Sequence, residues 1–391
     1  MPERVGQPAV VRQLLERSLE ADPGRAALHV KLAHVHLDQL DHRNAAICLE
    51  RAVALDPSAR EPRLLLARCY NRLGETDAVL RVLEDIVGPH YERAAALADR
   101  GDPAAEREFR DVLALRPNDT QACRLLCRLL RRSGRHAELV ELCEALFVRG
   151  AINAQFLYNW GVALALNGDA DRAKRLMFDP VHISRIELPV PEGFSDIAEF
   201  NDALAEEILA SPNPIREFPV EVEANRGSRR VDNLFHGRRA DLIGRLVQSF
   251  QQVSETYRAV RRDGFDPWPS LRPVEARVRP WGLLQRNHAY ETGHIHPLGW
   301  LSGVYYVRVP KAISAAGEGP GCLAFGPPAA ISAELAPTVR YAPREGMLLL
   351  APSHYEHWTI PSGVNEERIS IAFDVVPEMN GYPRKQEVRL A

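Results

Sequence analysis

A helix–turn–helix pattern recurs at a nearly fixed spacing in the first half of the 391-residue chain. Asp22-Pro23 and Asp56-Pro57 each follow a helix-like segment, and the interval between them, about 34 residues, is the length of one helix–turn–helix unit. Arg116-Pro117 closes a similar segment a little short of two such periods later. A single pair of helices cannot bury its apolar face alone, so repeated pairs must stack on one another. The spacing therefore predicts an all-α solenoid over residues 8–177.

Small residues stand where the paired helices of such a solenoid must approach closely. Ala33 is expected to face Ala45 and Ala52, and the unit from Ala154 carries Trp160 and Gly168 at corresponding places. Period and composition together resemble the tetratricopeptide repeat. The resemblance implies two alternative roles: a rigid spacer or dimerisation surface, or a concave face that holds a peptide, a protein or a carrier. Nothing in the sequence separates them.

Prolines end the helical pattern. Three of them, Pro180, Pro189 and Pro191, fall in residues 178–192, which we interpret as a linker to a second domain over residues 193–391. Amphipathic helices are expected at 194–210 and 238–260. From about Val274 the sequence changes to short β-like runs separated by Gly and Pro, which is typical of a sandwich or jelly roll. The expected strands are 276–278, 282–284, 303–309, 322–325, 338–341, 347–351, 357–360 and 369–376. The predicted fold class is an α+β multidomain chain, with the solenoid followed by a jelly roll and flanking helices.

Composition excludes several kinds of partner. A formal net charge of −3 gives no basis for binding nucleic acid or an anionic membrane. No apolar stretch approaches the roughly 20 residues of a membrane helix, and residues 1–9 hold no signal-peptide core. Cys123 and Cys127 are one helical turn apart, but no second pair gives zinc spacing, so we interpret the six cysteines as buried thiols. The chain is expected to be cytoplasmic.

The second half concentrates metal-binding and anion-binding side chains. His294 and His296 are two positions apart, and in a β-strand such residues point to the same face. Both imidazoles can therefore meet one metal ion. His357 is a third imidazole, and Arg368 follows it on the next expected strand. A guanidinium pairs with a carboxylate through two parallel hydrogen bonds, so Arg368 is a candidate anion-binding residue.

Four stretches carry a more specific resemblance: H-I-H-P-L-G-W-L-S-G-V-Y-Y-V, G-C-L-A-F-G-P-P, R-E-G-M-L-L-L-A-P-S-H-Y-E-H-W and E-E-R-I-S-I-A-F. They resemble the 2-oxoglutarate and iron(II) dependent oxygenases of the double-stranded β-helix superfamily, over about residues 186–377. The resemblance implies that His294 and His357 bind iron(II). It also implies that Arg368, with Ser370 beside it, holds the distal carboxylate of 2-oxoglutarate. Tyr290 is a further candidate for cosubstrate binding, and Asn287 is a weaker one.

His296 departs from the family pattern, which has a carboxylate at this position. An imidazole there leaves the metal with one more positive charge. Three interpretations stay open: His296 is the third ligand; His296 lies behind the ligands and Glu291 or water completes the site; or the site no longer binds metal. Of the neighbouring residues, Asp374 is expected on the barrel surface and His354 at the rim or in solvent.

The resemblance implies a dioxygenase that uses iron(II), 2-oxoglutarate and O₂, with hydroxylation as the default outcome. The fused solenoid suggests a peptide, protein or carrier-bound amino acid as substrate, while a free small molecule and a homodimer through the repeats stay open. Two other functions compete with this interpretation. One is a three-His dioxygenase that needs no keto acid, and it would leave Arg368 without a role. The other is a non-catalytic scaffold with a relic barrel.

Overall fold

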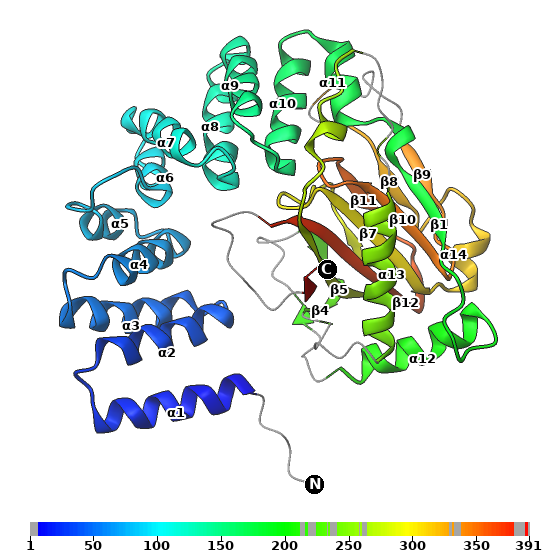
Figure 1. The fold of residues 1–391 in the computed structure, drawn as a ribbon, viewed down its shortest axis with the longest axis horizontal. Helices are drawn as coiled ribbons and strands as arrows, with labels where there is room; N and C mark the ends of the chain where they lie inside the picture. The colour runs from blue at the N-terminus through cyan, green and yellow to red at the C-terminus, as the bar shows by residue number, and fades with distance from the viewer. Residues whose placement is uncertain are drawn as a thin grey trace. The chain divides into compact units, whose positions relative to one another are not determined.

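The computed structural model in Figure 1 describes most of the chain. The described residues are 7–211, 216–217, 224–232, 234, 241–257, 259, 264–327, 331, 338–378 and 388–389. They form two compact units, Met1–Leu129 and Leu130–Ala391. None of the described helices is both long and apolar enough to span a bilayer. All six cysteines are buried free thiols.

Paired helices build the first part of the chain, as the repeat spacing predicts. The helices are α1 (Gln7–Ala21), α2 (Ala26–Asp38), α3 (His42–Leu55), α4 (Arg60–Leu73), α5 (Thr76–Val82), α6 (Tyr91–Asp99), α7 (Ala104–Leu115) and α8 (Thr120–Arg132). Ala33, Ala45 and Ala52 are fully buried, so the small side chains do let α2 and α3 approach closely. Helices α5 and α6 are short, which accounts for an interval between Pro57 and Pro117 that falls short of two full periods. Gly74 ends α4 at a φ of 73°, a left-handed conformation that glycine adopts without strain.

The second unit begins with the last helices of the repeat pattern. These are α9 (His136–Val148), α10 (Ala154–Leu166) and α11 (Ala170–Met177). Helix α10 is apolar on nearly all sides and is buried along most of its length. A helix of this composition must be covered all round by protein. Its amino-terminal end lies against the barrel, where the Gln155 N–H donates to the Pro297 carbonyl at 3.3 Å.

The barrel has an eight-stranded antiparallel sheet in the order β1-β10-β7-β12-β5-β4-β2, with β13 also pairing with β5. A three-stranded sheet, β11-β8-β9, and a two-stranded sheet, β3-β6, complete it. The strands are β1 (Ser184–Glu187), β2 (Arg216–Glu217), β3 (Asn225–Arg226), β4 (Arg229–Val231), β5 (Ala276–Asn287), β6 (Tyr290–Glu291), β7 (Leu301–Arg308), β8 (Leu323–Phe325), β9 (Val339–Tyr341), β10 (Met347–Pro352), β11 (His357–Thr359), β12 (Val364–Pro377) and β13 (Val388–Arg389). The predicted jelly roll is confirmed, except that the first two expected strands form one strand, β5.

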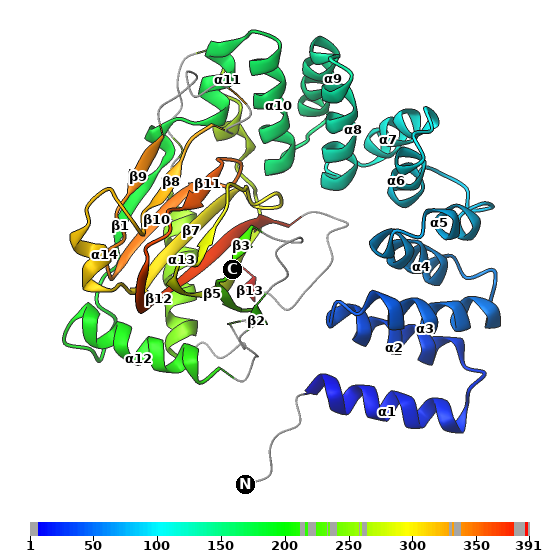
Figure 2. The same cartoon turned by 180° about the vertical axis from the view of Figure 1, so that it is seen from behind.

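Successive side chains of β12 point alternately to the packed core and to the cavity of the barrel. Helices α12 (Ile197–Leu209) and α13 (Leu242–Thr256) flank the large sheet, and Figures 1 and 2 show α13 lying across one face of it. Phe373 points to that face and stacks on Phe250 of α13, with ring centroids 4.1 Å apart. Gly303 on β7 makes room for the ring, since a Cβ there would come within 2.4 Å of Phe373. Alternation along a strand then turns residues 368, 370, 372 and 374 to the opposite face.

Candidate metal centre and cavity

The three histidines of interest come together at one place in the barrel. His294 and His296 lie in the loop between β6 and β7, and His357 opens β11. A single antiparallel bridge joins two of them: the His294 N–H donates to the His357 carbonyl at 3.1 Å, and the reverse bond is 3.0 Å. The sequence predicts His294 and His296 on a strand, whereas this bridge is the only strand-like pairing of that loop among the described residues. One nitrogen of each ring nevertheless lies within 4.8 Å of the others.

Each ring is held so that the same nitrogen faces the common point. The Nδ1 atoms of His294 and His357 lie 2.7 Å and 3.0 Å from the carbonyl oxygens of Thr292 and Tyr355. The Nδ1 of His296 lies 2.5 Å from the carboxylate of Asp374. These oxygens only accept hydrogen bonds, so each Nδ1 carries a proton and each Nε2 is the nitrogen left to meet a metal ion. Such outer contacts are what fix the tautomer of metal-binding histidines.

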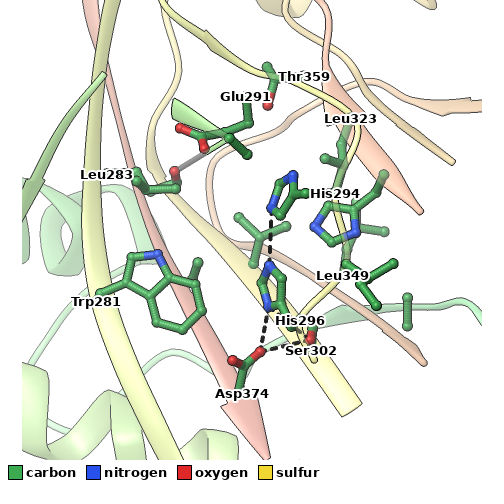
Figure 3. Close-up of a pocket in the computed structure, with 18 of the residues that line it drawn as sticks. Trp281, Leu283, Glu291, His294, His296, Ser302, Leu323, Leu349, Thr359 and Asp374 are labelled. Atoms are coloured by element: carbon green, nitrogen blue, oxygen red, sulfur yellow. Dashed lines mark hydrogen bonds and ion pairs between the residues drawn. The ribbon is translucent and has the colours of Figure 1, made fainter. Parts of the chain in front are cut away.

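This arrangement fits a metal ion. The Nε2 atoms of His294 and His296 are 3.2 Å apart, and Figure 3 shows the two rings facing each other. A metal ion bound to both Nε2 atoms would take the place of this direct contact between the two nitrogens. Two nitrogens bound at right angles to one metal, with bonds of about 2.1 Å, would lie about 3 Å apart. Burial, with the nearby His296, lowers the pKa of His294 to about 4, and burial holds that of His357 well below its usual value. Both rings are therefore neutral at pH 7, as ligands must be.

The histidines line a cavity of about 430 Å³ inside the barrel. Arg368 and Ser370 also line it, while Tyr290 and Asn287 do not. Asn287 is exposed at the end of β5, at a φ of 53°, and its carbonyl accepts from the Gly363 N–H at 2.8 Å. The lining also holds polar and aromatic side chains that the sequence does not predict there: Asn225, Arg230, Arg279, Trp281, Gln285, Ser302, Tyr306, Thr359 and Asp374.

Arg368 is a buried cation with neutral neighbours in direct contact. Only 6% of the residue is exposed. Its Nη1 donates to the Gly321 carbonyl at 2.6 Å and its Nη2 donates to the side-chain oxygen of Gln285, while its Nε has no hydrogen-bond partner among the described residues. Burial lowers the pKa of the guanidinium. A buried arginine that lines a cavity is suited to an anionic ligand.

Asp374 is expected on the barrel surface from the sequence, and that expectation is wrong. Its side chain is 13% exposed, lies in the cavity and contacts His296 (Figure 3). Burial acts to raise the pKa of its carboxyl, but His296, Ser302 and Arg279 together lower it, so Asp374 is ionised at neutral pH. The signal is present in the sequence: Arg368, Ser370 and Asp374 have the same parity on one strand, which puts them on one face.

His354 is likewise not at the rim. It is 2% exposed, and its Nε2 donates to the Leu176 carbonyl at the end of α11 at 2.8 Å. Glu291 lines the cavity but is not part of the three-residue cluster that could hold a metal ion. Among the described residues, none of the acids considered from the sequence belongs to the cluster of three histidines that could hold a metal ion.

The jelly roll gathers three imidazoles, which could hold a metal ion, and a buried arginine at one cavity. Residues 279–374, about a quarter of the chain, match the family model described as "Putative 2OG-Fe(II) oxygenase". This range contains all three histidines, Arg368 and Asp374. Residues 279–374 are therefore a domain of the 2-oxoglutarate and iron(II) oxygenase type, as the resemblance implies, and a run of paired helices precedes them.

Solved structures resemble each half separately. A prolyl-4-hydroxylase from Pseudomonas putida is 16% identical over 51% of this chain and 94% of its own, with a TM-score of 0.34. HygX from Streptomyces hygroscopicus, solved with nickel and 2-oxoglutarate bound, is 14% identical over 53% and 87%, with a TM-score of 0.34. YrrB, a tetratricopeptide-repeat protein with an unusual peptide-binding site, is 18% identical over 42% and 88%, with a TM-score of 0.33. No curated protein sequence matches the chain.

Proposed function

We propose that the carboxy-terminal domain is a non-haem iron(II), 2-oxoglutarate-dependent dioxygenase that hydroxylates an unactivated C–H bond. The observation that supports this most is the common orientation of three imidazoles, each with Nδ1 occupied by an acceptor and Nε2 turned to one point. His294, His296 and His357 would hold iron(II), which with 2-oxoglutarate and O₂ supplies the oxidising chemistry.

Arg368 is the residue that would bind 2-oxoglutarate. Its charged guanidinium would hold the distal carboxylate, with Ser370 on the same face of β12. The apolar side chains beside them on the same sheet, including Val304 and Leu349, would exclude water from the reacting C–H bond. A cavity of about 430 Å³ is large enough for a small cosubstrate and one side chain of a substrate.

The first experiment is an anaerobic titration of the full-length protein with iron(II) and then 2-oxoglutarate. A weak visible charge-transfer band is expected in the wild type, and Arg368→Ala should weaken it. Arg286→Ala is the matched control, because Arg286 is an exposed arginine of β5 that pairs with Glu367 outside the cavity, so its band should be unchanged. Iron binding without a band would favour the three-His dioxygenase that needs no keto acid. Absence of iron binding would favour the interaction scaffold.

We further propose that the substrate is a peptide, a protein or a carrier-bound amino acid recruited with the help of the repeats. What supports this is the fusion of helical repeats to the oxygenase domain in one chain. Consumption of 2-oxoglutarate by the full-length protein should rise more with peptides than with the same amino acids supplied free. Stimulation by free amino acids alone would contradict recruitment while leaving the proposed chemistry intact.

A further inference from the structure

The family pattern has a carboxylate at the position of His296. This chain has an imidazole there, and a carboxylate, that of Asp374, contacts the imidazole from behind. Asp374 Oδ1 lies 2.5 Å from the Nδ1 of His296, and Ser302 Oγ donates to the same oxygen at 2.7 Å. Figure 3 shows these three side chains as a chain that ends at the His294 ring. Ser353 extends the network, since its hydroxyl is 2.7 Å from that of Ser302 and its carbonyl accepts from the His296 N–H at 3.0 Å.

The contact between Asp374 and His296 affects the net charge of the metal site. Three neutral imidazoles leave iron(II) with its full double charge, whereas two imidazoles and a carboxylate leave it with one positive charge. An ionised carboxylate on the Nδ1–H of a ligand histidine returns negative charge to the site and makes Nε2 more basic. Asp374 is the acid that makes this contact, and its low exposure keeps solvent from screening it.

We propose that Asp374 is a positioning residue of the metal site, acting through His296. It fixes the His296 tautomer and ring orientation and supplies the negative charge that a carboxylate ligand would otherwise bring. This role rests on the proposed function, because it presumes a metal on the three histidines.

A structural alternative exists on the same strand pair. Arg279 of β5 is the register partner of Asp374 on β12, and the two charges interact. If Asp374 served only to balance Arg279, its removal would lower the free energy of unfolding but leave metal affinity unchanged. The two roles therefore differ in a quantity that can be measured without turnover.

The test is a double-mutant cycle on Co(II) affinity, measured by calorimetry with full-length protein. Asp374→Asn keeps an oxygen that accepts from Nδ1 but removes the charge, and it should weaken Co(II) binding about 10- to 100-fold. In the His296→Ala background the same substitution should change affinity less than about 3-fold, because the residue that carries the effect is gone. Ser302→Ala is the comparison variant: it removes the hydrogen bond to the same oxygen and the 3.0 Å contact of the Ser302 hydroxyl with the His296 Nδ1, and it keeps the carboxylate. Its effect should be clearly smaller.

Two other outcomes are possible, one against the role of Asp374 and one against the proposed function. Unchanged affinity in Asp374→Asn, or equal loss with and without His296, overturns the role of Asp374 while the proposed function stands. Wild-type protein that binds no Co(II) overturns the proposed function and this role with it. Urea unfolding of every metal-free variant separates loss of the site from loss of the fold, and the intensity of the Co(II) visible bands gives a second readout of coordination.

Discussion

At the scale of single residues, the cavity combines ionised groups whose contacts decide what they can bind. Arg368 makes its two direct hydrogen bonds to neutral acceptors, the Gly321 carbonyl and the Gln285 amide oxygen. Neutral acceptors hold the guanidinium in place without cancelling its charge. Gln285 is held in turn, because its Nε2 donates to the hydroxyl of Ser228 at 2.9 Å. Gln285 is therefore the residue that should orient Arg368.

Replacing Gln285 by Met should weaken 2-oxoglutarate binding without changing metal affinity. The variant removes one hydrogen bond from Arg368, which is worth about 1–1.5 kcal/mol, so the Kd for 2-oxoglutarate should rise roughly 5- to 10-fold. Calorimetry on the Co(II)-loaded protein measures this, and metal titration gives the unaffected quantity. Ser228→Ala, which removes only the outer hydrogen bond, should have a smaller effect. An unchanged Kd in Gln285→Met would show that Arg368 does not need this support.

The sequence predicts the metal-binding and anion-binding residues of the cavity, but it does not predict which side chains contact them from distant parts of the chain. Two histidines at i and i+2, followed by a third histidine and an arginine, form a pattern that the sequence shows, and the structure brings these side chains to one cavity. Asp374 is misplaced from the sequence although it has the parity of Arg368 and Ser370 on one strand, because parity gives the face of a strand but not the partner that a side chain meets there. Its partner, His296, is 78 residues away in the sequence, so no local pattern could pair them.

At the scale of elements, α10 supports both loops that carry the histidines. The Gln155 N–H at its start binds the Pro297 carbonyl, beside His296. The Tyr158 hydroxyl donates to Glu356 at 2.9 Å, beside His357. Burial raises the pKa of the Glu356 carboxyl, and the Tyr158 hydrogen bond acts in the opposite direction. A helix of the repeat pattern thus fixes the positions of two metal-site loops.

Removing the Tyr158 hydroxyl should loosen this support. Tyr158→Phe leaves a partly buried carboxylate without its donor, so the free energy of unfolding should fall by about 1–3 kcal/mol in urea, and Co(II) affinity should fall a few-fold. The same substitution is then made in a Glu356→Gln protein. The glutamine side chain is uncharged, so leaving its oxygen without a hydrogen-bond donor costs less free energy than leaving a carboxylate without one. There Tyr158→Phe should cost less, and an equal loss in both backgrounds would mean that the hydroxyl acts elsewhere.

At the scale of the whole molecule, the repeat pattern and the compact units divide the chain differently. The helical pattern runs to Met177, whereas contacts join Leu130–Ala391 into one compact unit that includes α9 to α11. The repeat spacing, the prolines and the short β-like runs are local features of the sequence, so the helices and strands could be predicted from them. Which core a given helix joins is set by contacts far apart in the sequence, such as Tyr158 with Glu356, and no periodicity encodes these.

Acid should destabilise this second unit through His354, which joins α11 to the turn before β11. Burial lowers the pKa of His354 to about 3, from an unfolded value near 6.5. Between these values the unfolded chain binds more protons than the folded one, so stability falls as the pH falls. From pH 7.5 to 5.5 this one residue should cost about 1.4 kcal/mol.

His354→Gln isolates this term, because an amide can still donate to the Leu176 carbonyl and does not titrate. Urea unfolding of the metal-free proteins at both pH values measures it. The stability difference between wild type and variant should shift by about 1.4 kcal/mol in favour of the variant at pH 5.5, since the other titrating groups are common to both and cancel. The same difference at both pH values would mean that His354 titrates normally in the folded protein. Its burial between helix and barrel would then be much looser than its 2% exposure indicates.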